Sequence, residues 1–159
     1  MKPLTLFFTL FFIGTLMRGF SQSKIHPLEN VENLQKTEKR NLLVFLHTDW
    51  CSYCKTMQNS TFKNNKVQDL LKEKFYFVAL NGEEKSTIAF ADAVFTYQPT
   101  GVKTGYHELA LALGSSAGQV SYPTLVLLNP KHEIVFQHTG YMTAIDLLKI
   151  LEISNIVEE

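Results

Sequence analysis

The chain has 159 residues, of which 45% are hydrophobic and 19% charged, with 15 basic and 15 acidic side chains. Eight glycines and five prolines exclude a collagen-like or low-complexity chain, and the hydrophobic content with zero formal net charge argues against disorder. Because the charges balance, the sequence offers no basic stripe for counterion release, and we expect no nucleic acid among its partners.

The first residues have the layout of a secretory signal: a basic Lys2, an apolar run over residues 4–13 and a small-x-small site at residues 19–21. The run is shorter than the roughly 18–20 residues that span a bilayer. We therefore predict a cleavable signal peptide over residues 1–21, followed by a single domain over residues 22–159. The protein is then exported, to the periplasm in a cell with two membranes. An uncleaved membrane anchor is the alternative.

The hydrophobic pattern next predicts a helix after Pro27, a buried strand over 42–46, helical turns over 55–60 and 67–74, and a second buried strand over 75–80. The strand–helix–strand order over 42–80 indicates a βαβ unit with parallel pairing.

The second half of the chain predicts shorter elements. They are a small hairpin with strands at 87–90 and 93–97, a loop over 99–105, a helix over 106–113 stopped by Gly114, a flexible segment over 115–119, strands over 124–128 and 133–138, and a last helix capped by Thr143 and Asp146. This order predicts a mixed sheet with helices on both faces.

The two cysteines, Cys51 and Cys54, are three positions apart at the predicted junction between strand and helix. A bridge that closes so short a loop stabilises little, so a chemical role is favoured over a structural one. Free backbone N–H groups and the positive end of the helix dipole favour the thiolate at a first helical turn. Because the thiolate is the nucleophile, we predict that Cys51 attacks and that Cys54 resolves the mixed disulfide.

Two separated motifs resemble the thioredoxin superfamily. Residues 50–55, Trp-Cys-Ser-Tyr-Cys-Lys, resemble its active-site motif, and residues 121–124, Ser-Tyr-Pro-Thr, look like its cis-proline segment. The resemblance covers about residues 28–157 and is closest to small exported thioredoxin-like proteins and to the C-terminal thioredoxin domain of transmembrane disulfide reductases. It implies a thioredoxin fold, that is, an α/β domain with a central mixed sheet flanked by helices, here with a small hairpin inserted after the second strand.

The resemblance also implies roles for residues around the cysteine pair. Pro123 is then a cis-proline beside the disulfide, and Trp50, Tyr53, Tyr122 and Pro123 contact the substrate. The residue before this proline offers backbone hydrogen bonds to an extended client.

Some positions depart from the family pattern. Residues 83–105 form a longer connection than usual, either a specificity element or an elaborated edge. Phe45 and Ala79 stand where thioredoxin has a buried aspartate and a lysine, and Ser52 and Tyr53 replace its Gly-Pro dipeptide. The usual proton acceptor for Cys54 is thus absent, which leaves the direction of electron flow open.

The expected function is that of an exported thiol–disulfide oxidoreductase acting as a reductase. Such a protein needs disulfide-containing clients and a membrane electron donor or acceptor for the cysteine pair. We expect no metal or organic cofactor, and a monomer. The alternatives are a dithiol oxidase or isomerase, and a client-binding, chaperone-like module in which redox chemistry is incidental.

Three further interpretations concern individual side chains. In the first, the cysteine pair is a purely structural disulfide. In the second, the two cysteines bind copper together with His47. His107 and Glu108, on the short helix, are expected to be solvated or to cap that helix rather than to reach the site.

Overall fold

The computed structural model describes residues 25–116 and 118–156, so the predicted signal peptide lies outside the described residues. In chain order the elements are α1 Leu28–Thr37, β1 Asn41–His47, α2 Ser52–Asn59, the 3-10 helix η1 Thr61–Lys63, α3 Asn65–Lys74, β2 Phe75–Asn81, β3 Ile88–Phe90, β4 Ala93–Phe95, β5 Tyr97–Pro99, β6 Gly105–His107, α4 Glu108–Gly114, β7 Ser115–Ser116, β8 Gln119–Val120, β9 Thr124–Leu128, β10 Ile134–Thr139 and α5 Ala144–Ile156. None of the helices within these residues is long and apolar enough to cross a membrane.

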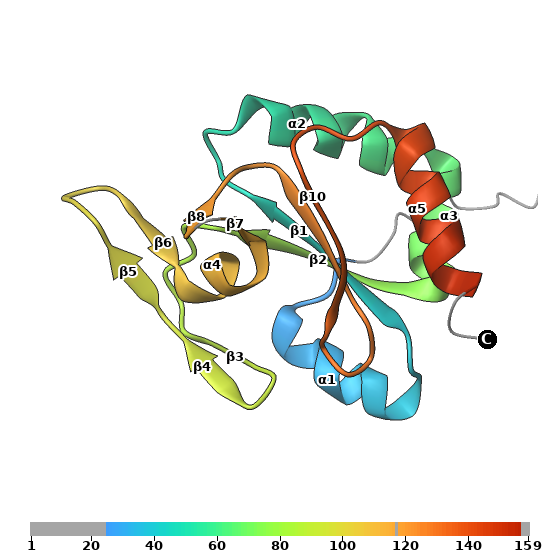
Figure 1. The fold of residues 1–159 in the computed structure, drawn as a ribbon, viewed down its shortest axis with the longest axis horizontal. Coiled ribbons are helices and arrows are strands. Elements are labelled where there is room, and N and C mark those ends of the chain that lie inside the picture. The colour runs from blue at the N-terminus through green and yellow to red at the C-terminus, as the bar shows by residue number, and fades with distance from the viewer. Residues whose placement is uncertain (1–24, 117, 157–159) are drawn as a thin grey trace, which may run out of the picture.

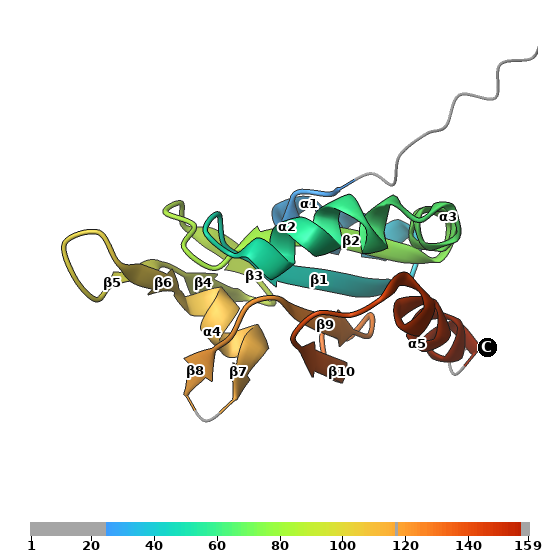
Figure 2. The same cartoon turned by 90° about the horizontal axis from the view of Figure 1, so that it is seen from above.

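A four-stranded mixed sheet in the order β10-β9-β1-β2 forms the centre of the fold (Figure 1). Strands β1 and β2 are parallel, which confirms the predicted βαβ unit. Strand β9 runs antiparallel to both β1 and β10. Figure 2 shows β2 and β10 on opposite sides of the molecule, as the two outer strands of this sheet.

The helices cover both faces of the sheet, because the central strand β1 is apolar on both. Leu42, Val44 and Leu46 face a core shared with α1, α4 and β3. Leu43 and Phe45 face the other core, which is shared with α2, α3 and α5 and includes the two cysteines. Residues 42–46 are all at most 1% exposed, as expected for a strand buried on both sides.

The connection after β2 contains two hairpins where the sequence predicted one. The predicted hairpin is confirmed, with β3 paired to β4. The predicted loop over 99–105 is confirmed for residues 100–104, which connect β5 to β6, but the pairing of these two strands was not predicted. The predicted helix over 106–113 begins only at Glu108. The strands of this second hairpin are three residues long, too short for a period-two pattern to stand out from a loop.

In the C-terminal half of the chain, β7 and β8 form a further short hairpin, where a flexible segment over 115–119 was predicted. The predicted cap of α5 is confirmed. The Thr143 hydroxyl accepts a hydrogen bond from the backbone N–H of Asp146 at 3.2 Å and donates to the Asp146 carboxylate at 2.7 Å.

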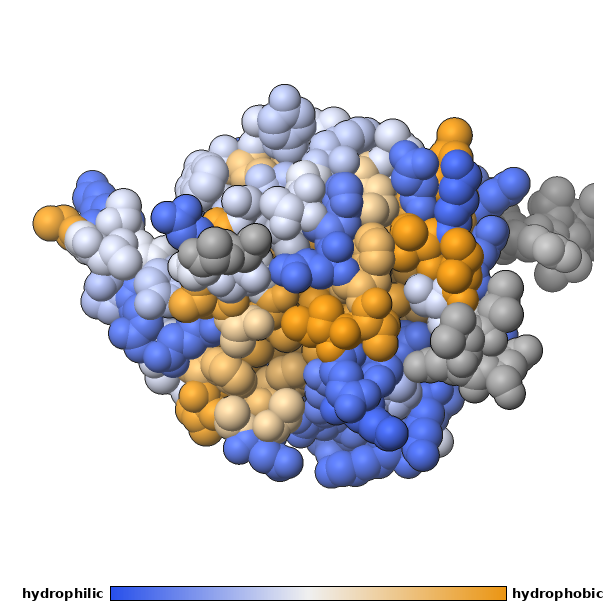
Figure 3. Space-filling view, viewed as in Figure 1, coloured by the Kyte–Doolittle hydropathy of each residue, from blue (hydrophilic) through white to orange (hydrophobic). Residues whose placement is uncertain are grey.

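Strand β10 forms one edge of the sheet and carries exposed apolar side chains. Ile134 is 46% and Val135 is 54% exposed. Figure 3 shows hydrophobic residues gathered in the middle of the face on which β10 lies in the view of Figure 1. The register shifts between Ile134 and Phe136. Such a bulge interrupts the ladder and is a common protection of an edge against pairing with another chain.

Candidate functional site

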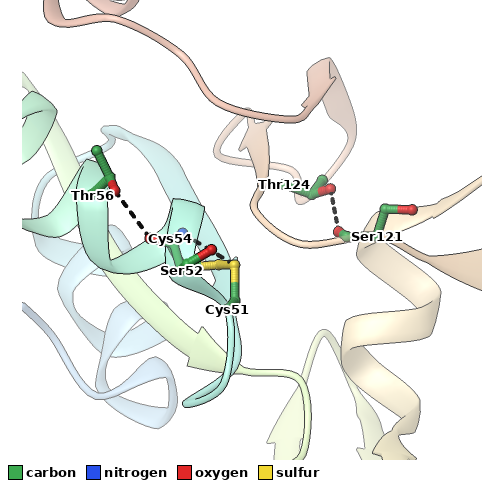
Figure 4. The surroundings of a disulfide bond; sticks show 6 residues. All are labelled: Cys51, Ser52, Cys54, Thr56, Ser121 and Thr124. Atoms are coloured by element: carbon green, nitrogen blue, oxygen red, sulfur yellow. Dashed lines mark hydrogen bonds between the residues drawn. A yellow bond between two sulfur atoms is a disulfide. The ribbon is translucent and has the colours of Figure 1, made fainter.

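Cys51 and Cys54 form a disulfide at the N-terminus of α2 (Figure 4). Cys51 is the N-cap of the helix, and its Sγ accepts a hydrogen bond from the backbone N–H of Cys54 at 3.1 Å. Both residues are buried, Cys51 at 5% exposure and Cys54 at 1%. After reduction, the same N–H and the helix N-terminus stabilise negative charge on the Cys51 sulfur.

The chain reaches this position through a tight turn after β1. The backbone N–H of Cys51 donates to the carbonyl of Thr48 at 3.3 Å, and the Cys51 carbonyl accepts the N–H of Lys55 at 3.2 Å. Thr48 is buried, while Asp49 and Trp50 project into solvent. The turn therefore presents Trp50 at the surface and keeps the sulfur atoms just below it.

The loop between β8 and β9 lies across from the disulfide, as Figure 4 shows for Ser121 and Thr124. The Tyr122–Pro123 peptide bond within this loop is cis, as expected for this bond. The Thr124 hydroxyl donates to the carbonyl of Ser121 at 2.7 Å, and the backbone N–H of Gly140 donates to the carbonyl of Pro123 at 2.8 Å. These bonds hold the loop in place on both sides of the proline.

Three aromatic side chains surround the disulfide at the surface. Trp50 and Tyr53 are 67% and 65% exposed. The half-buried Tyr122 meets Trp50 edge-to-face, with ring centroids 6.0 Å apart. The structure thus brings together Trp50, Tyr122 and the cis-proline loop beside the disulfide, and it leaves Tyr53 exposed between the cysteines.

Tyr122 lies against the end of β2, where Gly82 leaves room for its ring. A Cβ atom at Gly82 would overlap the Tyr122 phenol, so this close approach requires glycine. Burial raises the pKa of Tyr122, and the negative charge of Glu83 raises it further. The hydroxyl therefore stays protonated and keeps its donor at neutral pH.

The profile of the thioredoxin-like domain family matches residues 29–154. The chain belongs to this family. A thioredoxin from Thermus thermophilus has a TM-score of 0.60 and 22% identity, over 84% of this chain and 88% of that one. The structure described as DsbH oxidoreductase has a TM-score of 0.58 and 13% identity, over 83% and 84%.

The C-terminal domain of Neisseria meningitidis DsbD, in its reduced form, has a TM-score of 0.50 and 15% identity, over 78% of this chain and 89% of that one. At these identities the likeness is one of fold. No curated protein matches the sequence. A thioredoxin-like chain with a Cys-x-x-Cys disulfide at the start of α2 is a thiol–disulfide oxidoreductase.

The interior behind the disulfide differs from the pattern of thioredoxin itself. Phe45 and Ala79 are direct partners in the parallel β1–β2 ladder. The Phe45 ring is fully buried and packs on Phe62, with centroids 4.9 Å apart. A cavity of about 270 Å³ is lined by both positions and by Gln58. These two positions therefore supply no carboxylate or ammonium to take the proton of Cys54.

His47 lies at the end of β1, half-buried and stacked on Phe45 with ring centroids 5.5 Å apart. Burial lowers the pKa of His47 below the ordinary 6.5, and the negative charge of Asp49 offsets part of that effect. Within the described residues, no group of three or more His, Cys, Asp and Glu side chains is placed to hold a metal ion. His47 and the two cysteines therefore do not form such a group in this disulfide state.

We expect NMR titration to give His47 a pKa below 6.5, so that the ring is neutral at pH 7. Because the unfolded chain then binds more protons just below pH 6.5, the free energy of unfolding should fall as the pH is lowered through that value. His47→Gln should remove this contribution, which urea unfolding at several pH values would measure. A rise in stability on acidification that depends on His47 would contradict the lowered pKa.

His107 and Glu108 do not belong to the disulfide site, and the capping role is confirmed for His107 alone. The His107 Nδ1 accepts the N–H of Leu109 at 3.3 Å and caps α4. The Glu108 carboxylate accepts hydrogen bonds from the backbone and hydroxyl of Thr96 and from Gln98. The Thr96 bonds, followed by that of Gln98, lower the pKa of Glu108, so it stays charged and ties the second hairpin to α4.

The sequence patterns did not single out Gly82, Glu83 or Tyr106. Gly82 lies against the Tyr122 ring, and Glu83 and Tyr106 line a groove together with Tyr122. The one feature of the sequence that pointed to this region was the unusual length of the connection after β2. That signal marks a segment but does not say which of its side chains turns toward the disulfide.

Proposed function

We propose that this protein is an exported disulfide reductase in which Cys51 is the attacking cysteine and Cys54 the resolving cysteine. The observation that carries the proposal is the Cys51–Cys54 disulfide at the N-terminus of α2, with the Cys51 sulfur on the helix N-cap. The N-cap position and the slightly greater exposure of Cys51 favour it over Cys54 as the nucleophile.

The reaction is a pair of thiol–disulfide exchanges. The Cys51 thiolate attacks one sulfur of a client disulfide, an S–S bond forms between Cys51 and the client, and the other client sulfur leaves as a thiolate that takes up a proton. Cys54 then loses its proton and attacks the Cys51 sulfur, which releases the second client thiol. The client gains two electrons, and the Cys51–Cys54 disulfide is formed.

An exported reductase must itself be reduced again. The signal-like residues 1–21 support export, with the periplasm as the compartment in a cell with two membranes. Because an exported compartment lacks an abundant thiol pool, we propose a membrane electron donor for the Cys51–Cys54 pair. The fold likeness to the DsbD C-terminal domain supports this placement. We further propose that Trp50, Tyr53, Tyr122 and Pro123 contact the client.

The reduction potential of the Cys51–Cys54 couple tests the direction of electron flow. We expect a value near that of thioredoxin, about −270 mV, when the protein is equilibrated with dithiothreitol buffers. A value toward about −120 mV would instead identify a dithiol oxidase. If no reversible couple is found, the redox function fails and client binding alone remains.

The material for this measurement is the mature protein, recovered from cells that export it through its own N-terminal segment. If the signal is cleaved as predicted, that protein begins at Gln22. A chain that keeps residues 1–21 and sediments with membranes would support the anchor alternative.

A further inference from the structure

A groove of about 400 Å³ opens next to the aromatic pair formed by Trp50 and Tyr122. Its walls come from the turn before α2, the loop before β9, the connection after β2, the helix α4 and the hairpin β7–β8. The side chains that matter here are Trp50, Glu83, Tyr106, Leu111, Val120 and Tyr122. Because Trp50 precedes Cys51 and Tyr122 precedes the cis-proline, a client joined to Cys51 has its neighbouring residues beside this groove.

The inserted connection builds one wall of the groove and is firmly attached to the rest of the fold. The backbone N–H of His107 donates to the carbonyl of Gly82 at 2.7 Å, which joins β6 to the end of β2. The N–H of Glu108 donates to the carbonyl of Thr96 at 3.0 Å, and the Glu108 carboxylate holds the same residue from the other side. Tyr106 on β6 is thus held in place by the backbone hydrogen bonds of the next two residues, His107 and Glu108.

The groove combines aromatic and aliphatic walls with one acidic side chain, Glu83. This carboxylate is partly buried, and its charge reaches the Tyr122 phenol. In the described part of the chain the salt bridges are Arg40–Glu38 and Lys149–Asp146, so Glu83 forms no salt bridge there. The nearby Lys85 is engaged elsewhere, with its Nζ 3.1 Å from the centroid of the Tyr97 ring.

We propose that this groove binds the side chain of an arginine or lysine that lies next to the disulfide cysteine of an extended client, and that Glu83 selects for it. A cation is attracted to the faces of aromatic rings and forms a charge-assisted hydrogen bond with a carboxylate, and the groove offers both partners. This inference rests on the proposed function, since it names the clients of the same site. The long connection after β2, which carries Glu83, is then a specificity element.

Binding is tested without redox chemistry in the Cys51→Ser/Cys54→Ser protein. Trp50 is the one tryptophan of the sequence, so intrinsic tryptophan fluorescence reports directly on this groove. Peptides of one length carry a central serine in place of the client cysteine and differ only in an adjacent arginine, glutamine or glutamate. We expect the arginine peptide to bind about five- to tenfold more tightly than the glutamate peptide at low salt, with the difference shrinking at high salt.

Two variants decide whether Glu83 causes the preference. Glu83→Gln should bring the arginine and glutamate peptides to within about twofold of each other, and Glu83→Lys should reverse their order. Glu73→Gln makes the same charge change at an exposed position of α3 and should leave the preference intact. Equal binding of all three peptides, or a preference that survives Glu83→Gln, would overturn the inference.

The reduced wild-type protein, acting on the matching peptide disulfides, separates this inference from the proposed function. If all peptides are reduced at one rate, and Glu83→Gln does not change that rate, the groove assignment is wrong and the proposed reductase function stands. If peptide binding depends on Glu83 but no peptide is reduced, the groove assignment stands and the proposed reductase function is wrong.

Discussion

Replacing Cys51 with serine should abolish the reduction of insulin disulfides, with a loss of at least about a thousandfold in rate, because a neutral hydroxyl cannot replace a thiolate as the attacking group. Cys54→Ser should give a different result. Its Cys51 still attacks, but nothing resolves the product, so mixed disulfides with clients should accumulate and appear as bands on non-reducing gels.

Comparing the two serine variants requires a control that also lacks the disulfide. Both variants lack the Cys51–Cys54 bridge, so the matched control is the wild-type protein with its cysteines reduced. All three proteins should unfold at similar urea concentrations if the serine side chains leave α2 in place. Full insulin reduction by the Cys51→Ser variant would show that Cys51 is not the nucleophile. Equal trapping of clients by both variants would mean that either cysteine can attack.

Phe45→Ala should destabilise the protein by about 3–5 kcal/mol, which is a large part of the roughly 5–15 kcal/mol that holds a domain folded. The ring is completely buried, packs on Phe62 and His47, and already borders a cavity. Removing it enlarges that cavity, which is also lined by Gln58 and Asn59 of α2. Chemical denaturation of the oxidised protein measures the change in the free energy of unfolding.

Two control variants show whether the loss comes from packing. Phe45→Leu keeps most of the apolar volume and should cost about 1–1.5 kcal/mol. Val102→Ala, at a fully exposed position, should change stability by less than about 0.5 kcal/mol. A Phe45→Ala protein as stable as the Val102 variant would mean that the ring does not pack as described.

The central sheet and the disulfide site were predictable because their signals are local and strong. The apolar run over residues 42–46 and the run that begins at Phe75 are long enough to specify buried strands, and they became β1 and β2. The spacing of Cys51 and Cys54 at the junction between a strand and a helix, and the Tyr122–Pro123 pair before a strand, indicate the family from the sequence alone. The capping pair of Thr143 and Asp146 was likewise readable from spacing.

The second hairpin was not predictable in the same way. Strands β5 and β6 are only three residues long, and their sequences carry no periodicity. They form because Glu108, in α4, binds Thr96 and Gln98, and because His107 binds Gly82. These interactions join residues about ten or more positions apart, so no short window of sequence contains them.

The chemistry of this protein can be read from short stretches of its chain: a cysteine pair at the start of a helix, a proline segment before a buried strand, and a phenylalanine in place of a buried aspartate. The surroundings of the cysteine pair depend instead on how distant segments pack in the folded protein. Whether Glu83 and Tyr106 turn toward Trp50 or away from it depends on contacts between the end of β2, the inserted hairpin and α4. Local preferences specify strands and caps, whereas a groove is made by the packing of segments that are distant in the chain.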